Sequence, residues 1–294
     1  MTESSTSREV FSQPELWAGV ETILATAAGL PVDGERVAVV GCGTSWFMAQ
    51  AYAALREGAG QGETDAFTAS EFPAGRRYDR IVTISRSGTT TEIVQLLQAT
   101  DTPSALLTAV AGGPAATHAD AEIVLAEADE TSVVQTRFAT TTLALLRASL
   151  GVDLTAAVTD ARTALQEPLE DVWIQADQLT FLGTGWTIGL AHEAALKLRE
   201  SSQSWTESYV AMEYRHGPIS IAQPGRVVWV FGPVPAGLAE DVAATGATLV
   251  TSDLDPLAHL ALLHRVAVAR AETRGLNPDT PRHLSRAVHL TAED

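Results

Sequence analysis

The fold is decided by the stretch RVAVVGCGTS, residues 36–45. Four apolar residues, Val37–Val40, run into Gly41, and a helical pattern follows from Trp46 to Glu57. A continuous apolar run that stops at a glycine turn before a helix is typical of a strand buried on both faces of a parallel sheet. This strand–turn–helix unit therefore predicts an α/β fold.

The same alternation continues through the first half of the chain. We expect further strands at residues 79–85, 105–110 and 122–125, and helices at 9–30, 91–99 and 133–149. Strands that alternate with helices form parallel sheets covered on both faces. The first half therefore predicts one complete α/β layer structure.

The second half repeats the plan. We expect strands at residues 179–183, 226–231, 247–250 and 264–268, and a helix at 190–203. Superimposing Gly41 on Gly183 gives a repeat of 183 − 41 = 142 residues, about half the chain. We therefore expect two doubly wound parallel-sheet domains in tandem, each a flavodoxin-like three-layer sandwich. Residues 1–152 would hold an N-terminal helix and a phosphate-binding first domain, and residues 153–294 a linker helix, the second domain and a C-terminal tail.

Composition excludes several classes of function. The chain has 294 residues and a net charge of −17, which disfavours nucleic acid and anionic membrane surfaces as partners. A single cysteine, Cys42, allows neither an internal disulfide nor a thiolate metal cluster. The N-terminal stretch MTESSTSREV lacks the apolar core of a signal peptide, and no apolar run is long enough to span a bilayer. We expect a cytoplasmic protein.

Two hydroxyl-rich turns are candidate anion sites. Gly41-Cys-Gly-Thr-Ser45 ends the first strand, and its glycines, hydroxyls and helix N-terminal amides suit an anion, although a capped turn without a ligand explains it equally well. Ser85-Arg-Ser-Gly-Thr-Thr-Thr91 follows the next central strand and is more specific, because open α/β sheets bind ligands at the carboxyl ends of their strands. A merely solvated loop is the alternative, and Arg86 adds a charge suited to phosphate.

A third motif carries candidate proton-transfer residues. Glu193, Lys197 and Glu200 are spaced four and three residues apart and share one face of a predicted helix. An exposed ladder of ion pairs explains this spacing as well as a carboxylate base held beside an ammonium. His216-Gly-Pro218 then breaks the helical pattern and leaves an imidazole in a loop.

Taken together, the motifs resemble the tandem SIS (sugar isomerase) domains that form the isomerase part of glucosamine-6-phosphate synthases. The similar segments are residues 8–14 (REVFSQP), 42–45 (CGTS), 85–90 (SRSGTT), 130–137 (ETSVVQTR), 193–200 (EAALKLRE), 216–218 (HGP) and 281–288 (PRHLSRAV). The resemblance therefore covers nearly the whole chain.

The resemblance implies a role for each matching residue. The sugar phosphate would be bound by Gly43, Thr44, Ser45, Ser85, Arg86, Ser87, Thr90, Val133 and Gln135. Glu200 would carry a proton between C1 and C2 through an enediol-type intermediate, assisted by Lys197. His216, reaching in from the second subunit of a homodimer, would open the sugar ring. Glu130 and Glu193 would support these groups.

The sequence also departs from this family. Arg286 stands where the family has a tail lysine that forms a Schiff base, and a guanidinium cannot form an imine. Arg286 could instead pin a phosphate, hydroxyl or carboxylate. The family's glutamine-hydrolysing domain has no counterpart in this sequence, so we expect no ammonia from glutamine.

We therefore expect a phosphosugar isomerase or deaminase for a hexose 6-phosphate or amino-sugar 6-phosphate. A non-catalytic sugar-phosphate-binding regulator is the alternative, and an enzyme for a non-phosphorylated or otherwise modified sugar is a third possibility. Proton transfer beside a carbonyl can run on a carboxylate alone, so we expect no metal and no organic cofactor.

Overall fold

The computed structural model describes residues 3–290, which form two compact units. The N-terminal unit comprises residues 15–130, 137–154 and 284–290, and the C-terminal unit comprises residues 3–14, 131–136 and 155–283. The change of unit after Leu154 lies two residues from the predicted boundary. The prediction did not place the N-terminal segment with the second half of the chain, nor the tail with the first half.

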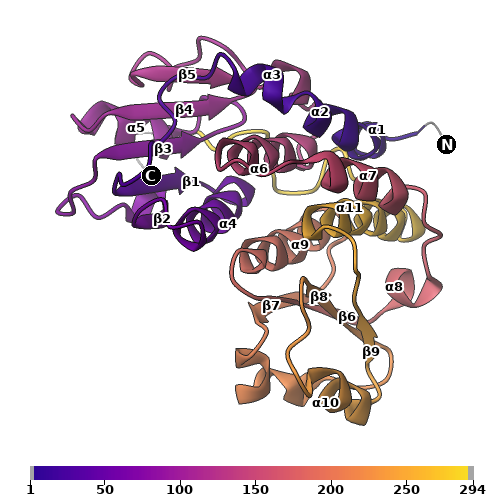
Figure 1. Ribbon diagram of the computed structural model, residues 1–294. Helices are drawn as coiled ribbons and strands as arrows, with labels where there is room; N and C mark the ends of the chain where they lie inside the picture. The colour runs from indigo at the N-terminus through magenta and orange to yellow at the C-terminus, as the bar shows by residue number, and fades with distance from the viewer. Residues whose placement is uncertain (1–2, 291–294) are drawn as a thin grey trace. The chain divides into compact units, whose positions relative to one another are not determined.

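The N-terminal unit is built on a five-stranded parallel sheet of order β2-β1-β3-β4-β5 (Figure 1). Its strands are β1 (Val37–Gly41), β2 (Thr64–Thr68), β3 (Arg80–Ile84), β4 (Ser104–Thr108) and β5 (Ala121–Val124). This order is that of flavodoxin-like sheets, and the winding direction reverses between β1 and β3. The predicted doubly wound α/β fold is confirmed.

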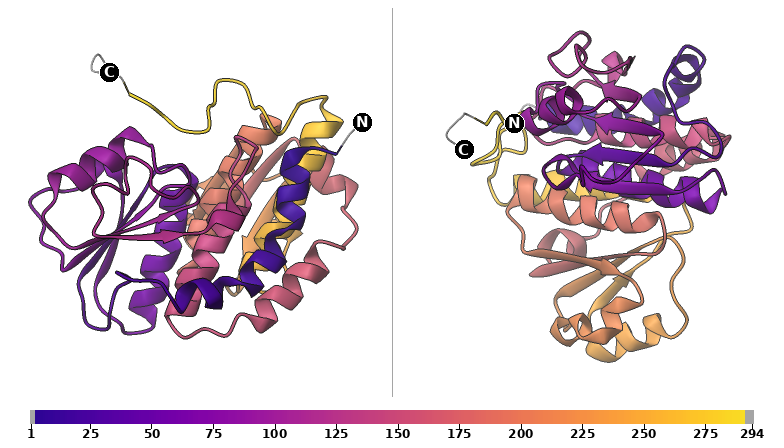
Figure 2. Two further views of the ribbon diagram at one scale, coloured as in Figure 1. Left: turned by 90° about the horizontal axis from the view of Figure 1, so that it is seen from above. Right: turned by 90° about the vertical axis from the view of Figure 1, so that its left-hand side faces the viewer.

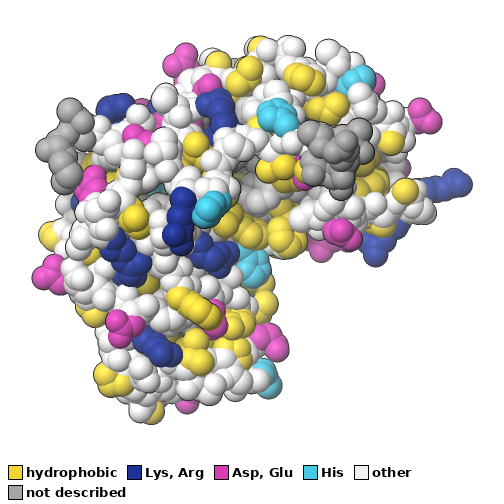
Figure 3. All heavy atoms as spheres, turned by 180° about the vertical axis from the view of Figure 1, so that it is seen from behind, with side chains coloured by type: hydrophobic (Ala, Val, Ile, Leu, Met, Phe, Trp, Pro, Cys, Tyr) yellow, Lys and Arg dark blue, Asp and Glu magenta, His cyan; other side chains and the backbone are white. Residues whose placement is uncertain are grey.

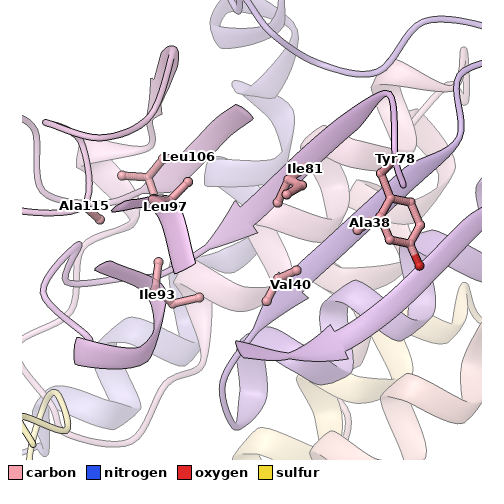
Figure 4. Packing of buried hydrophobic residues seen from close by; sticks show 8 residues of the cluster. All are labelled: Ala38, Val40, Tyr78, Ile81, Ile93, Leu97, Leu106 and Ala115. Carbon is pink, nitrogen blue, oxygen red and sulfur yellow. The ribbon is translucent and has the colours of Figure 1, made fainter. Parts of the chain in front are cut away.

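Helices cover both faces of this sheet. They are α2 (Gln13–Ala18), α3 (Val20–Leu24), α4 (Thr44–Gly58), α5 (Thr91–Ala99) and α6 (Arg137–Ser149). Helix α5 turns Ile93 and Leu97 toward Val40 of β1 and Leu106 of β4 (Figure 4). Because side chains alternate along a strand, Val37 and Val39 face the opposite side, which α4 and α6 cover.

The C-terminal unit repeats the plan with four parallel strands of order β7-β6-β8-β9. Its strands are β6 (Gln178–Gly183), β7 (Thr206–Val210), β8 (Arg226–Phe231) and β9 (Thr248–Val250), and its α-helices are α1 (Ser5–Phe11), α7 (Thr155–Ala164), α8 (Asp171–Gln175), α9 (Thr187–Ser202), α10 (Leu238–Thr245) and α11 (Pro256–Thr273). Helices α9 and α11 cover one face of the sheet and α10 the other (Figure 2, right).

The repeat explains two glycines. A Cβ on Gly41 would lie 2.5 Å from the backbone carbon of Ser45, and one on Gly183 would lie 2.3 Å from the backbone oxygen of Thr187. Both distances are far below van der Waals contact. Each strand therefore needs glycine where the following helix packs against its end, and the same constraint recurs 142 residues apart.

The predicted strand at residues 264–268 is wrong, because these residues lie in the middle of helix α11. Asp255 begins this helix by accepting a hydrogen bond from the Leu257 amide at 2.9 Å, and Pro256 occupies its first turn. The helix is buried on nearly all sides. A helix that is apolar all round has no amphipathic period, so its sequence resembles a buried strand.

The sequence pattern also missed the strands β2 and β7. Each is an edge strand with partly exposed, polar residues, TDAFT and TESYV. Short, polar strands are common at sheet edges because they discourage pairing with other chains. The predicted helix at residues 9–30 is divided into α1, α2 and α3, and the one predicted at 133–149 begins at Arg137.

The face of the molecule shown in Figure 3 carries side chains of both charges. On the face shown in Figure 3, acidic side chains are scattered and basic side chains lie among them, so no single acidic patch covers this face. Within residues 3–290, no helix is long and apolar enough to cross a bilayer. The same residues contain no group of three or more histidine, cysteine or acidic side chains suited to a metal.

Candidate functional site

The two hydroxyl-rich turns of the N-terminal unit lie side by side. Strands β1 and β3 are neighbours, and their register pairs Gly41 with Ile84. The turn at 42–45 and the loop at 85–90 therefore leave adjacent strands at the same edge of the sheet. This edge is where the winding direction reverses, the usual ligand-binding position of an open α/β sheet.

The loop at 85–90 is held firmly by its own backbone. The Gly88 amide donates to the Ser85 carbonyl at 3.2 Å, with Gly88 at φ +64°. The Arg86 carbonyl accepts from the Ala109 amide at 3.0 Å and from the Thr108 hydroxyl at 3.2 Å. Only glycine adopts this backbone conformation without strain. The loop therefore presents its hydroxyls from a fixed frame.

Several hydroxyls and amides of this edge are suited to an oxyanion. Ser45 and Ser85 are almost fully buried, and the Ser85 hydroxyl lies 3.4 Å from that of Thr90. Within residues 3–290, the Thr44 and Ser45 side chains make no hydrogen bond, so their hydroxyls remain available as donors. They stand in the first turn of the 15-residue helix α4, where the positive end of the helix dipole favours an anion.

The matching edge of the C-terminal unit is built differently. Thr187, the counterpart of Ser45, donates its hydroxyl to the Thr184 and Phe231 carbonyls at 3.0 and 2.8 Å and accepts from the Thr184 amide. The segment after β8, GPVPAG at 232–237, contains no hydroxyl side chain. Only the N-terminal unit therefore combines hydroxyl donors with both of these turns.

Arg86 is directed away from a simple phosphate contact. Its guanidinium forms an ion pair with Glu130 at 3.2 Å, and both side chains are buried. It also donates to the Arg286 carbonyl at 3.2 Å, while Glu130 accepts from the Arg137 amide at 2.8 Å. Glu130 thus neutralises Arg86 and fixes it beneath the loop. A direct contact of Arg86 with phosphate stays a prediction.

The tail crosses the same edge of the N-terminal unit. Arg286 donates to the Glu130 carbonyl and pairs with the Asp129 carboxylate. Farther along the tail, the Leu290 backbone amide donates to the hydroxyl of Thr91, the first residue of α5, at 3.0 Å. Arg286 therefore pins a carboxylate, as the sequence allowed, but this carboxylate belongs to the chain itself.

The C-terminal unit carries the three charged residues of the proton-transfer motif on helix α9. The Lys197 Nζ lies 2.6 Å from Glu200 Oε2 and 3.7 Å from Glu193 Oε1. The Lys197 and Glu193 side chains are buried, whereas Glu200 is 19% exposed. An exposed ladder of ion pairs is therefore the wrong interpretation of this spacing, since only one carboxylate reaches the surface.

Lys197 is also the only lysine in the chain, because the other 18 of the 19 basic residues are arginines. Glu193 contacts a second buried residue, His264 of helix α11, whose Nε2 lies 3.3 Å from Glu193 Oε2. His264 was not among the predicted site residues, because the stretch 264–268 was predicted to be a strand. No sequence spacing links residues 193 and 264, which meet only through the packing of α9 on α11.

The other predicted residues lie on two segments of the C-terminal unit. The Val133 amide donates to the Asp279 carbonyl at 3.0 Å, and Gln135 has a buried Oε1 without a hydrogen-bond partner among the described residues. Glu9 of α1 holds this segment by accepting from the Thr131 amide at 2.5 Å. His216 ends a short 3₁₀ helix with its side chain exposed. Among the described residues of this unit, no hydrogen bond or ion pair joins His216 to Glu200, so their cooperation stays a prediction.

Comparison with known proteins agrees with this geometry. The family model of the SIS domain matches residues 32–150, which contain both hydroxyl-rich turns. The chain contains an SIS domain. The match does not extend to the second half, so a second SIS domain stays a prediction, although the C-terminal unit repeats the strand order.

Relatives and solved structures resemble more of the chain than the SIS domain alone. A glutamine–fructose-6-phosphate aminotransferase (isomerizing) from Sulfolobus acidocaldarius is 29% identical over 86% of this chain and 50% of the relative. The glucosamine-6-phosphate deaminase structure from Thermotoga maritima matches with a TM-score of 0.81 and 23% identity, over 98% of this chain and 100% of that one. The C-terminal domain of glucosamine-fructose-6-phosphate aminotransferase from Francisella tularensis matches with a TM-score of 0.79 and 22% identity, over 95% and 98%.

These comparisons show homology to the isomerase part of the aminotransferases and confirm the fold. The chain spans about half the length of the curated relatives it matches.

Proposed function

We propose that this chain is a phosphosugar isomerase or amino-sugar-phosphate deaminase that acts on a hexose 6-phosphate or amino-sugar 6-phosphate. The observation that carries the proposal is the partly exposed Glu200 carboxylate, held at 2.6 Å by the buried ammonium of the only lysine. A carboxylate fixed in this way, with one side open, is suited to act as a general base.

We assign phosphate binding to the SIS domain. The hydroxyls of Thr44, Ser45 and Ser85 supply neutral donors to the phosphate oxygens, at the positive end of the α4 dipole. Arg86 contributes through its pairing with Glu130, which keeps the loop rigid. The net charge of −17 does not oppose such a site, because surface charges are screened beyond ~8 Å at physiological salt.

We assign proton transfer to Glu200. The carboxylate takes the proton from C2 of the open-chain aldose, which leaves an enediolate with its negative charge on the C1 oxygen. Transfer of the C2 hydroxyl proton to the C1 oxygen, and return of the first proton from Glu200 to C1, give the ketose. Lys197 orients the carboxylate throughout, since its Nζ contacts Glu200 directly. General acid–base groups of this kind contribute about 10²- to 10⁴-fold to a rate.

The same proton transfer gives two products, according to the group at C2. A hexose 6-phosphate with a C2 hydroxyl yields the ketose phosphate. An amino sugar yields the C2 imine, which water hydrolyses to the ketose phosphate and ammonium. An imine with the enzyme is not required: Lys197 is buried between two carboxylates, and Arg286 cannot form one.

A panel of hexose and hexosamine 6-phosphates tests this proposal. Glucose, mannose, fructose and glucosamine 6-phosphates are each incubated with the protein, and aldose–ketose interconversion and ammonia release are both measured. We expect turnover of at least one member and weak or no turnover of the unphosphorylated sugars. Binding without turnover across the whole panel would instead support a sugar-phosphate-binding regulator, which needs the phosphate loop but not Glu200.

Two further parts of the proposal concern the assembly and the compartment. We place the enzyme in the cytoplasm and infer a homodimer in which His216 serves the neighbouring subunit by opening the sugar ring. The exposure of the His216 side chain, and the absence of a hydrogen bond to that side chain within residues 3–290, support a role outside its own subunit. Full activity of a monomer in size-exclusion chromatography would refute the shared residue.

A further inference from the structure

A buried pair lies behind the proton-transfer residues of the C-terminal unit. His264 of α11 and Glu193 of α9 contact each other through Nε2 and Oε2 at 3.3 Å, and both side chains are fully buried. Burying a carboxylate is costly unless it is paired and hydrogen-bonded. Glu193 meets this requirement through His264 of α11 and through Lys197 of its own helix.

The geometry fixes which ring nitrogen of His264 donates to Glu193. Its Nε2 faces Glu193, which can only accept a hydrogen bond, so Nε2 carries the proton. Its Nδ1 is buried and has no partner among the described residues. His264 is therefore held by its Nε2–H alone, and its hydrogen bond to Glu193 fixes the orientation of both side chains.

The other oxygen of Glu193 faces Lys197. The Lys197 Nζ lies 3.7 Å from Glu193 Oε1 on one side and 2.6 Å from Glu200 Oε2 on the other. A continuous line of contacts thus runs from His264 through Glu193 and Lys197 to the one carboxylate that is partly exposed.

We infer that His264 and Glu193 are positioning residues that hold the Lys197 ammonium against Glu200 while Glu200 gains and loses a proton. When Glu200 accepts a proton it becomes neutral, and Glu193 is then the remaining counter-charge for the buried ammonium. His264 orients Glu193 for this purpose by donating through Nε2. The catalytic part of this inference rests on the proposed function, whereas the placement of the ammonium does not.

Helix α11 supplies a matched control. His259 lies one and a half turns from His264 on the same helix and is also buried, but it stacks on Trp229 at 4.8 Å between ring centroids and contacts no carboxylate. Burial lowers the pKa of His259 to about 3, so His259 is neutral at physiological pH. Replacing either histidine by leucine costs similar packing, but only one replacement removes a donor to Glu193.

The single lysine allows a direct spectroscopic test. Protein labelled with nitrogen-15 lysine gives one side-chain ammonium signal, that of Lys197. We expect His264→Leu and Glu193→Gln to shift this signal or to lose it through faster proton exchange. His264→Gln, which can still donate an N–H toward Glu193, restores it, and His259→Leu leaves it unchanged.

Kinetics with the best substrate of the sugar-phosphate panel supply the second test. We expect His264→Leu to lower kcat about tenfold or more with KM nearly unchanged, because a misplaced ammonium affects the reacting carboxylate more than phosphate binding. His264→Gln should recover most of the lost kcat, and His259→Leu should retain the wild-type value.

Distinct results separate the failure of each proposal. An ammonium signal that is the same in wild type, His264→Leu and Glu193→Gln, with all three folded, overturns the positioning role, whatever the activity. An Nδ1–H tautomer of His264 in the wild-type protein, with no proton on Nε2, also overturns it. Absence of turnover in the wild type, with the expected ammonium shifts, overturns the proposed function and leaves the positioning role standing.

Discussion

Replacing Glu200 by glutamine should abolish turnover while leaving the fold and sugar-phosphate binding intact. Glutamine has the size of glutamate and keeps an oxygen that can accept from Lys197, but it cannot accept a proton from carbon. The loss of a general base corresponds to a decrease of about 10²- to 10⁴-fold in kcat, or about 3–5 kcal/mol in the activation barrier.

The effect of Glu200→Gln on stability should be small by comparison. Lys197 loses its charged partner at 2.6 Å but keeps Glu193 at 3.7 Å, so the buried ammonium is not left without a carboxylate. Replacing one charge-assisted hydrogen bond by a neutral one costs about 1–2 kcal/mol. The melting temperature should therefore fall by only a few degrees.

The assay compares wild type, Glu200→Gln and Glu240→Gln in kcat, KM and calorimetric binding of fructose 6-phosphate. Glu240 is exposed on helix α10 and makes the same chemical change where no role is assigned. We expect turnover to be lost in Glu200→Gln alone, with binding of fructose 6-phosphate within a fewfold of wild type. Glu200→Gln turning over as fast as wild type would refute the assignment of the base.

Three further outcomes follow from the structure. Gly88→Ala should weaken fructose 6-phosphate binding about tenfold, because a side chain at φ +64° costs ~1–2 kcal/mol and the new Cβ would lie 3.3 Å from the Thr108 hydroxyl. The control is Gly60→Ala, which is also at positive φ but has open space around it, and it should leave the calorimetric affinity unchanged. Arg270→Met should lower the free energy of unfolding by about 3 kcal/mol or more in denaturant titration, because the buried guanidinium donates to the carbonyls of Trp173, Ile174 and Ala176 at 2.8–2.9 Å. A decrease in the free energy of unfolding below about 1 kcal/mol would contradict this expectation. Burial alone would raise the pKa of Asp279, but the amides of Thr6 and Ser5 and the Thr6 hydroxyl donate to its carboxylate and lower the pKa overall. The ionised carboxylate therefore stabilises the fold fully above about pH 4, and this stabilisation is lost as the pH falls through the lowered pKa. In thermal melts, the difference in melting temperature between wild type and Asp279→Asn should disappear only in strong acid.

Sequence reasoning succeeded where local pattern and tertiary environment agree. Val37–Val40 and the strand at 226–231 are central and buried on both faces, so their apolar runs are unambiguous. Gly41 and Gly183 marked the repeat because a helix must pack against each strand end. Sequence reasoning failed at α11, whose largely apolar sequence fits a helix and a strand equally well. It also failed at the edge strands β2 and β7, because their polar residues lack the apolar pattern of a buried strand.

The candidate site was predictable only in its local parts. Glu193, Lys197 and Glu200 are within two turns of one helix, so their contact follows from spacing. The pairing of Arg86 with Glu130 joins residues 44 positions apart, and that of Glu193 with His264 joins residues 71 positions apart. Such contacts depend on which helices pack together, and no local periodicity encodes that packing.

Proton nuclear magnetic resonance in deuterium oxide tests the central claim most directly. Wild-type protein is incubated with glucosamine 6-phosphate or fructose 6-phosphate, and the C1 and C2 protons are followed. Transfer of a proton by Glu200 through an enediol predicts conversion of the sugar or replacement of these protons by deuterium, with neither in Glu200→Gln. Unchanged C1 and C2 signals in the wild type, with the sugar phosphate bound, would contradict the account.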